Sequence, residues 1–259
     1  MNILLTNDDG INAEGIRALA DALKDDYDVY VVAPDKQNSA TSHHVTFFHT
    51  EHKAIKVEIE GVKEAWAIEG GTPADSAYYA LNGLINEKID LVISGINHGE
   101  NLSADCMYSG TVAAALEGYM AGIPSIATSY CSYTDKDFSV CTEIIKEFIP
   151  EFMKDKNNTQ YCMNLNVPFL KREEIKGYKV CGFGGNQLYK NIVHSKKLES
   201  GDILFYPEPT SGNKSKIGIH DDSDTVAISE GYVTLTPLCL DFVYHKMIDE
   251  IKDYEKLEI

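Results

Sequence analysis

Residues 1–34 constrain the fold most strongly, because they contain a complete strand–helix–strand unit. Apolar runs typical of buried strands occupy residues 3–6 and 29–33, and Pro34 ends the second run. Between them, apolar residues recur at the i, i+3, i+4, i+7 spacing of one helix face: Ile16, Leu19, Ala20 and Leu23. Apolar runs without polar alternation are typical of strands covered on both faces. This unit therefore predicts a parallel sheet in an α/β fold.

The same alternation of strands and helices continues to about residue 154. It predicts a β-hairpin at residues 53–68 and strands at 89–94 and 123–128. It also predicts helices at 72–81, 109–122 and 138–152. The helix at 72–81 has an N-terminal pattern in Thr72, Pro73 and Asp75, which supply an N-cap, a first-turn proline and an acid three residues after the cap.

Beyond residue 154 the pattern weakens into short segments separated by Gly, Pro, Asn and Ser. It predicts short strands at residues 162–167, 178–181 and 203–206 and a further strand at 231–238. It also predicts a short helix at 224–229 and an amphipathic terminal helix at 242–257. We therefore expect one domain over residues 1–259, Rossmann-like, with a mostly parallel sheet and helices on both faces. Its core is expected at 1–150 and 223–240, with 151–222 and 241–259 as irregular additions.

The charge balance excludes several classes of partner. The chain has 40 acidic and 23 basic residues, a net charge of −17. Nucleic-acid polymers and anionic membrane surfaces are bound by basic faces, so neither is an expected partner. No apolar run approaches the roughly 18 residues of a membrane span, and no basic leader begins the chain, so we expect a cytoplasmic protein. A small anionic ligand remains compatible, because a bound cation reverses the field within one cleft.

Three polar clusters follow predicted strands, at the edge where open parallel sheets bind ligands. They occupy residues 7–10, 34–42 and 95–99. Asp8 and Asp9 are adjacent carboxylates that repel each other unless a cation lies between them, although Asp-Gly is also a common turn pair. Together with the Ser39 hydroxyl and the Asn97 amide oxygen they form the all-oxygen set that Mg²⁺ or Mn²⁺ prefers. We predict one divalent cation there.

Ser109, Gly110 and Thr111 open a predicted helix, where unpaired N–H groups and a small residue suit a phosphate. Simple N-capping by Ser109 explains the same residues equally well. His98 follows Asn97 and is a candidate donor to a phosphate oxygen. The histidines of the loop fit no metal-ligand spacing and are expected to be solvated; they are His43, His44, His49 and His52.

Several motifs occur in order along nearly the whole chain: NDDGI at 7–11, GTPAD at 71–75, SGIN at 94–97, YSGTV at 108–112, GIPSIA at 122–127 and, near the end, EGYV at 230–233 with TPL at 236–238. Together these motifs resemble those of the stationary-phase survival protein SurE family. The chain departs from the family pattern at several positions, among them Ala40 and Ser103, which each stand where a glycine is usual.

The resemblance implies a metal-dependent 5'-nucleotidase that converts nucleoside 5'-monophosphates to nucleosides and phosphate, with some 3'-nucleotides and short polyphosphate as further substrates. It implies Asp8, Asp9, Ser39 and Asn97 as metal ligands. From this oxygen set we hypothesise that Asp8 and Asp9 are catalytic, one of them orienting or deprotonating the attacking water. The resemblance places Asn101, Ser109, Gly110 and Thr111 at the phosphate. It also implies dimers or tetramers built by exchange of C-terminal segments. The alternative from a different class is a nucleotide-binding sensor without catalysis.

Overall fold

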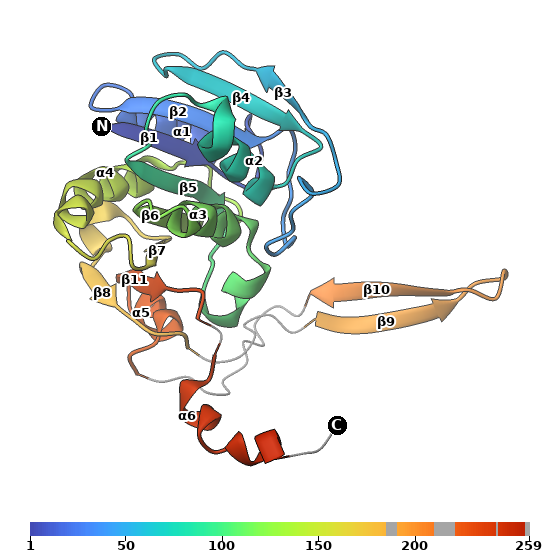
Figure 1. Cartoon of the computed structure of the whole chain (residues 1–259). Helices are drawn as coiled ribbons and strands as arrows, with labels where there is room; N and C mark the ends of the chain where they lie inside the picture. The colour runs from blue at the N-terminus through green and yellow to red at the C-terminus, as the bar shows by residue number, and fades with distance from the viewer. Residues whose placement is uncertain (185–190, 210–220, 242, 257–259) are drawn as a thin grey trace.

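A nine-stranded sheet organises the molecule (Figure 1), in the order β3-β4-β2-β1-β5-β6-β7-β11-β8. The computed structural model describes residues 1–184, 191–209, 221–241 and 243–256. The strands of the sheet are β1 (Asn2–Thr6), β2 (Asp28–Pro34), β3 (Lys53–Lys56), β4 (Glu64–Glu69), β5 (Leu91–His98), β6 (Ser125–Cys131), β7 (Cys162–Pro168), β8 (Tyr178–Val180) and β11 (Val233–Leu238). The helices around it are α1 (Glu14–Leu23), α2 (Pro73–Tyr79), α3 (Gly110–Met120), α4 (Ser139–Lys154) and α5 (Asp224–Ser229).

The centre of the sheet is parallel, as the strand–helix–strand unit predicts. Leu5 of β1 pairs with Val31 of β2 on one side and with Ile93 of β5 on the other. Only the β3–β4 and β7–β11 pairs are antiparallel among the described strands of this sheet. The carboxyl ends of β1, β2 and β5 therefore meet at one edge, which brings the three polar clusters of the sequence together.

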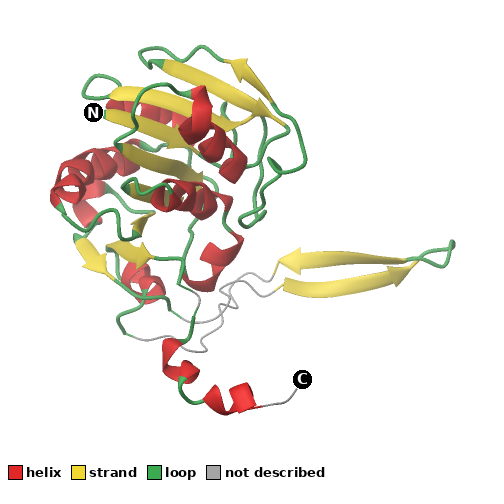
Figure 2. Ribbon diagram, in the orientation of Figure 1, coloured by secondary structure: helices red, strands yellow, loops and turns green. Residues whose placement is uncertain are grey.

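Helices cover both faces of the sheet (Figure 2). Successive β1 side chains point to opposite faces, so Ile3 and Leu5 pack with α1 and α4, whereas Leu4 packs in a separate cluster on the other face. Each fully buried Ile or Leu contributes about 1.5–3 kcal/mol through removal of apolar surface from water. The predicted Rossmann-like α/β fold is confirmed.

Most of the expected elements are present. The helix predicted at 224–229 is α5, and the hairpin predicted at 53–68 is β3 and β4, which join the main sheet because β4 lies parallel to β2. The capping pattern before α2 is also present, since Thr72 and Asp75 form a reciprocal capping box. The sheet continues past residue 150, however, because β7 lies between β6 and β11. The expected core limit at 150 is therefore too short.

The long terminal helix predicted at 242–257 is wrong. The described residues there form only a four-residue helix α6 (His245–Ile248) and a 3₁₀ turn (Lys252–Lys256), and residues 242 and 257 lie outside the described part. The apolar side chains of the segment, Ile248 and Ile251 among them, are exposed. An amphipathic helix owes most of its stability to packing of its apolar face, which this segment lacks here.

A two-stranded arm, β9 (Asn191–Lys197) and β10 (Ile203–Pro209), projects away from the sheet (Figure 1). Its side chains include exposed Val193, Ile203 and Phe205. A lone two-stranded hairpin is marginally stable in water, so we expect another protein surface to pack against this apolar arm. No helix in the described part of the chain has the length and apolar content that a membrane span requires.

Candidate active site at the carboxyl ends of the strands

The turn after β1 presents Asp8 and Asp9 at the ligand-binding edge. Asn7 closes this turn, because its side-chain nitrogen donates to the Gly10 carbonyl at 3.0 Å and its side-chain oxygen accepts from the Gly10 N–H at 3.1 Å. Gly10 has a φ of 97°, which glycine adopts without strain. An amide at position 7 can make both bonds, since it carries a donor and an acceptor.

Asp8 is buried against the N-terminus of α3, with 4% of its surface exposed. The Thr111 hydroxyl donates to Asp8 Oδ1 at 2.6 Å. Gly110 allows this close approach, because a β-carbon there would lie 2.8 Å from Asp8 Cβ. Burial, followed by the neighbouring charge of Asp9, raises the pKa of Asp8 to about 6, although the bond from Thr111 partly opposes this. The site thus holds a carboxylate whose charge calls for a cation.

Asp9 is less buried than Asp8 and is held by two donors. Gln37 Nε2 donates to Asp9 Oδ1 at 3.2 Å and to the Ser39 hydroxyl oxygen at 2.9 Å, while the His98 backbone N–H lies 3.4 Å from Asp9 Oδ2. Burial raises the pKa of Asp9, and the His98 and Gln37 bonds oppose that rise. Gln37 therefore links two predicted metal ligands that come from different loops.

A cavity of about 450 Å³ opens beside these residues. Its lining contains most of the predicted site residues, namely Asp8, Ser39, Asn97, His98, Asn101 and Ser109. A second cavity of about 490 Å³ is lined by Asp9 and Gln37, and both cavities share His98 and Tyr133. The two aspartates thus line two different cavities that have His98 and Tyr133 in common.

The remaining predicted residues have their own supports. Asn97 Nδ2 donates to the Gly99 carbonyl at 2.9 Å. This bond fixes the orientation of the amide group, so its oxygen Oδ1 points the other way. Asn101 donates to the Ser129 hydroxyl of β6 through Nδ2 at 2.9 Å. The Ser109 hydroxyl accepts from the Val112 N–H at 3.1 Å, so the capping role considered for Ser109 is present. Capping leaves the first-turn N–H groups of α3 beside Asp8.

His98, the candidate donor to phosphate, lines both cavities. Its ring packs edge-on against Phe138, with centroids 5.8 Å apart, and its buried Nε2 has no hydrogen-bond partner among the described residues. Its backbone N–H, rather than its ring, contacts Asp9.

Asp224 holds the segment that leads into Ser109. The Ser103 backbone N–H donates to Asp224 Oδ2 at 2.6 Å and the Ser103 hydroxyl donates to Oδ1 at 2.8 Å. The Gly184 N–H in turn donates to the Ser103 hydroxyl oxygen at 2.6 Å. Ser103 begins the 3₁₀ turn Ser103–Tyr108, so this buried carboxylate fixes the start of a cavity wall.

Gln37, Tyr133 and Asp224 are site residues that the sequence analysis missed. Gln37 lies two residues before Ser39 in a polar loop, which offered a weak indication. Tyr133 follows a strand of the sheet, as the other site loops do. Asp224 is 121 residues from its partner Ser103, and no local pattern marks such a pair.

Comparisons with known proteins agree with this geometry. A family model described as survival protein SurE matches residues 3–190. The 5'-nucleotidase SurE of Syntrophomonas wolfei is 38% identical over 253 residues, which cover 97% of this chain and 94% of that protein. The 5'-nucleotidase SurE of Pelotomaculum thermopropionicum is 40% identical over 260 residues, with coverage of 97% and 94%.

The fold is similar as well. The crystal structure of the SurE protein from Aquifex aeolicus superposes with a TM-score of 0.84 at 34% sequence identity, and the match covers 98% of this chain and 100% of that one. The ordered motifs, the sheet that brings them to one edge and the similarity along the chain lead to one conclusion: this chain belongs to the survival protein SurE family.

Proposed function

We propose that this chain is a metal-dependent 5'-nucleotidase that hydrolyses nucleoside 5'-monophosphates to nucleosides and phosphate. The observation that carries the proposal is the buried carboxylate of Asp8, which lies next to Asp9 and faces a cavity shared with Ser39 and Asn97. The two relatives described above, which are 38% and 40% identical to this chain, carry the name 5'-nucleotidase SurE. Some 3'-nucleotides and short polyphosphate belong to the same proposal, since all present a terminal phosphoryl group.

The side chains of the site fit one Mg²⁺ or Mn²⁺ ion. Two carboxylates, a hydroxyl and an amide oxygen are hard oxygen ligands, and we infer that Asp8, Asp9, Ser39 and Asn97 hold the ion. In the described part of the chain, no three His, Cys, Asp or Glu side chains are placed to share a metal ion, so this ligand set depends on the Ser39 hydroxyl and the Asn97 amide oxygen beside the two carboxylates. Burial raises the pKa of Asp8, and a cation would offset that cost. When bound, such an ion neutralises phosphate charge and lowers the pKa of water.

The chain's own residues supply the rest of the chemistry. Asp9, held by Gln37 and the His98 N–H, is the carboxylate placed to orient the attacking water and accept its proton. Asp8 stays fixed by the Thr111 hydroxyl. The first-turn N–H groups of α3 at Gly110 and Thr111, together with Asn101, bind the phosphate oxygens. In this scheme the water oxygen bonds to phosphorus as the bond from phosphorus to the nucleoside 5'-oxygen breaks, and that oxygen leaves with the proton that Asp9 took from the water.

We also propose a cytoplasmic homodimer or homotetramer. The apolar arm supports this, because Val193, Ile203 and Phe205 are exposed in a single copy. A net charge of −17 supports the absence of nucleic-acid polymers and anionic membranes among its partners.

Phosphate release from AMP, measured with Mn²⁺, with Mg²⁺ and with EDTA, tests the proposal. Asp9→Asn should lower turnover by about 10²–10⁴-fold, since a positioned general base contributes that much. Asp21→Asn, at an exposed position of α1, is the control and should behave like the wild type. Release that persists in EDTA would contradict the metal dependence. Binding of AMP without release under any condition would favour the nucleotide-binding sensor.

A further inference from the structure

The loop of residues 35–52 links β2 to β3 and contains neither helix nor strand. It carries Ser39 and Ala40, which line the cavity of about 450 Å³ together with Asp8. A long irregular loop that supplies a ligand has to be held by contacts outside itself, because its own backbone makes few.

Two anchors hold this loop near the cavity. The Asn38 N–H donates to the Asp8 carbonyl at 2.7 Å, and Ser42 donates to the Tyr108 carbonyl through its N–H at 2.9 Å and to the Met107 carbonyl through its hydroxyl at 2.7 Å. Between these anchors, Ala40 and Ser42 have φ values of 57° and 56°. Non-glycine residues keep such a conformation only where the surrounding structure enforces it.

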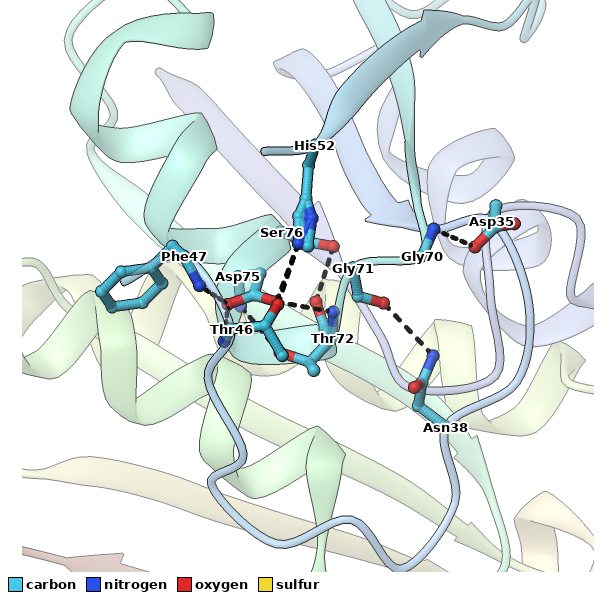
Figure 3. A network of polar contacts seen from close by, with 10 residues as sticks. All are labelled: Asp35, Asn38, Thr46, Phe47, His52, Gly70, Gly71, Thr72, Asp75 and Ser76. Carbon is cyan, nitrogen blue, oxygen red and sulfur yellow. Dashed lines mark hydrogen bonds and ion pairs between the residues drawn. The ribbon is translucent and has the colours of Figure 1, made fainter. Parts of the chain in front are cut away.

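A third anchor holds the far end of the loop, and it is a single buried carboxylate (Figure 3). Asp75 of α2 is fully buried. Its Oδ1 accepts from the Thr46 N–H at 2.8 Å and from the Phe47 N–H at 3.2 Å, and its Oδ2 accepts from the Thr46 hydroxyl at 2.5 Å. Oδ2 also accepts from the Thr72 N–H at 3.0 Å, which is the only bond that the capping box of α2 needs from it.

Neighbouring side chains reinforce this anchor. His52 Nε2 lies 2.8 Å from the Thr46 hydroxyl oxygen, and the Phe47 ring stacks on Tyr78 of α2 with centroids 4.0 Å apart. The His52 side chain is only 3% exposed, so the expectation of a solvated histidine is wrong for this residue, because the loop folds it against α2. Burial raises the pKa of Asp75, but the bonds from Thr46, Thr72 and Phe47 more than offset it and leave the pKa below its ordinary value. The anchor is therefore a charged acceptor.

We propose that Asp75 is a positioning residue of the active site, which holds Ser39 at the cavity by fixing Thr46 and Phe47 at the other end of the same loop. The inference rests on the proposed function, because Ser39 acts there as a metal ligand. With the far end released, only the anchors at Asn38 and Ser42 hold this part of the loop, and the strain at Ala40 and Ser42 then favours movement of the Ser39 hydroxyl away from Asp8 and Asp9. A carboxylate suits this task because both of its oxygens accept, whereas an amide has only one acceptor.

Removing Asp75 itself endangers α2, so the test weakens the connection from the loop side and leaves the Thr46 and Phe47 N–H bonds to Asp75 in place. Thr46→Val deletes one hydroxyl at a half-buried position and leaves the capping box intact. Thr46→Ser restores the hydroxyl. Thr72→Ala is the matched control, because it deletes a hydrogen bond of the same cluster, from the Asp75 N–H to the Thr72 hydroxyl oxygen at 3.0 Å, without touching the loop.

Mn²⁺ binding by titration calorimetry and thermal unfolding are measured on each purified variant. We expect Thr46→Val to raise the Mn²⁺ dissociation constant about tenfold, the size of effect that a hydrogen bond to a charged group supplies. Thr46→Ser should bind as the wild type does. Thr72→Ala should lower the unfolding temperature yet keep the dissociation constant within about twofold, since a lost cap costs stability alone.

The outcomes separate the two proposals. A wild-type protein that binds no Mn²⁺ would overturn the proposed function. Wild-type binding together with unchanged binding by Thr46→Val would overturn the positioning role alone. Equal weakening by Thr46→Val and Thr72→Ala would also overturn it, because the cluster would then act only through stability.

Discussion

Ala40 and Ser103 both lie in the left-handed region, at φ 57° and 52°, where the family resemblance leads one to expect glycine. Their surroundings differ. The Ser103 hydroxyl bonds to Asp224 and to the Gly184 N–H, whereas Ala40 has only a methyl group at the cavity wall. Backbone strain of this kind costs about 1–3 kcal/mol. At Ser103 the side chain compensates for the strain, and at Ala40 neighbouring anchors must impose it.

These two positions predict opposite responses to glycine. Ala40→Gly should raise the free energy of unfolding by about 0.5–1 kcal/mol, because relief of strain exceeds the entropic cost of glycine. Ser103→Gly should lower it by about 1 kcal/mol, since the Asp224 carboxylate loses a buried partner. Urea unfolding of both variants provides the measurement. A loss of stability in Ala40→Gly would show that the backbone there is not strained.

The raised pKa of Asp8 leads us to expect that the free energy of unfolding of the metal-free protein depends on pH. The folded-state pKa of Asp8, about 6, exceeds the ordinary 3.8, so the folded state binds more protons between these values. The corresponding stability is present below pH 4 and is lost as the pH rises through 6. Asn does not titrate. Relative to Asp8→Asn, the wild type should therefore lose about 2 kcal/mol between pH 4 and pH 7.

Chemical unfolding of wild type and Asp8→Asn in EDTA, at both pH values, measures that difference. Asp8→Asn should also lose Mn²⁺ binding and turnover, since it removes one of the two proposed carboxylate ligands. A difference between the two proteins that stays constant with pH would mean that the Asp8 carboxyl titrates normally.

At the scale of elements, the site depends on how closely α3 approaches the turn after β1. Gly110 begins α3, and a β-carbon there would lie 2.8 Å from Asp8 Cβ and 3.0 Å from Pro73 Cγ of α2. These distances are shorter than packed carbon atoms tolerate. One small residue thus lets two helices and a strand end converge on the same carboxylate.

Gly110→Ala should lower turnover of AMP by about 10²-fold, because a displacement of order 1 Å at a catalytic group has that effect. Its thermal stability should change much less, since alanine favours the helix and offsets part of the crowding. Gly182→Ala is the control, because a β-carbon there meets no atom within 4 Å. Wild-type turnover in Gly110→Ala would show that Asp8 accommodates the methyl group without moving.

At the scale of the whole molecule, the arm of β9 and β10 is the feature that a single copy does not explain. Phe205 is 66% exposed and pairs across the arm with Ser195, while Ile203 and Val193 lie at neighbouring positions of the same ladder. Apolar surface of this kind is stable when a second surface covers it. The proposed exchange of C-terminal segments between copies would provide that surface.

Phe205→Glu should therefore shift the protein toward a smaller mass in light scattering after size-exclusion chromatography, because a charge in a covered apolar interface is costly. Phe48→Glu is the control, since Phe48 is 73% exposed and belongs to the 35–52 loop rather than to the arm. A wild-type protein with the mass of one chain, or a mass unaffected by Phe205→Glu, would rule out assembly through the arm.

Several parts of the site were predictable from local sequence. Asp8 and Asp9 follow a buried strand, and Thr72 and Asp75 have the spacing of a capping box, so near neighbours in the sequence are enough to mark both pairs. The second task of Asp75 was not predictable, because its partner Thr46 is 29 residues away in a loop without periodicity. The prediction of a long terminal helix was wrong for a related reason, because it too depended on contacts distant in the sequence. Its apolar spacing is correct for a helix, but spacing does not supply a surface to pack on.

From the amino-acid sequence alone follow the α/β class, the order of most strands and helices and the oxygen-rich segments at strand ends, because periodicity and turn chemistry are properties of near neighbours. The tertiary structure alone shows that Gln37 joins Asp9 to Ser39, that Asp224 holds Ser103 and that Asp75 anchors the 35–52 loop. These contacts join segments whose separation in space depends on strand order and helix packing. These hydrogen bonds can therefore stabilise the site only once the sheet has formed and brought their donors and acceptors together.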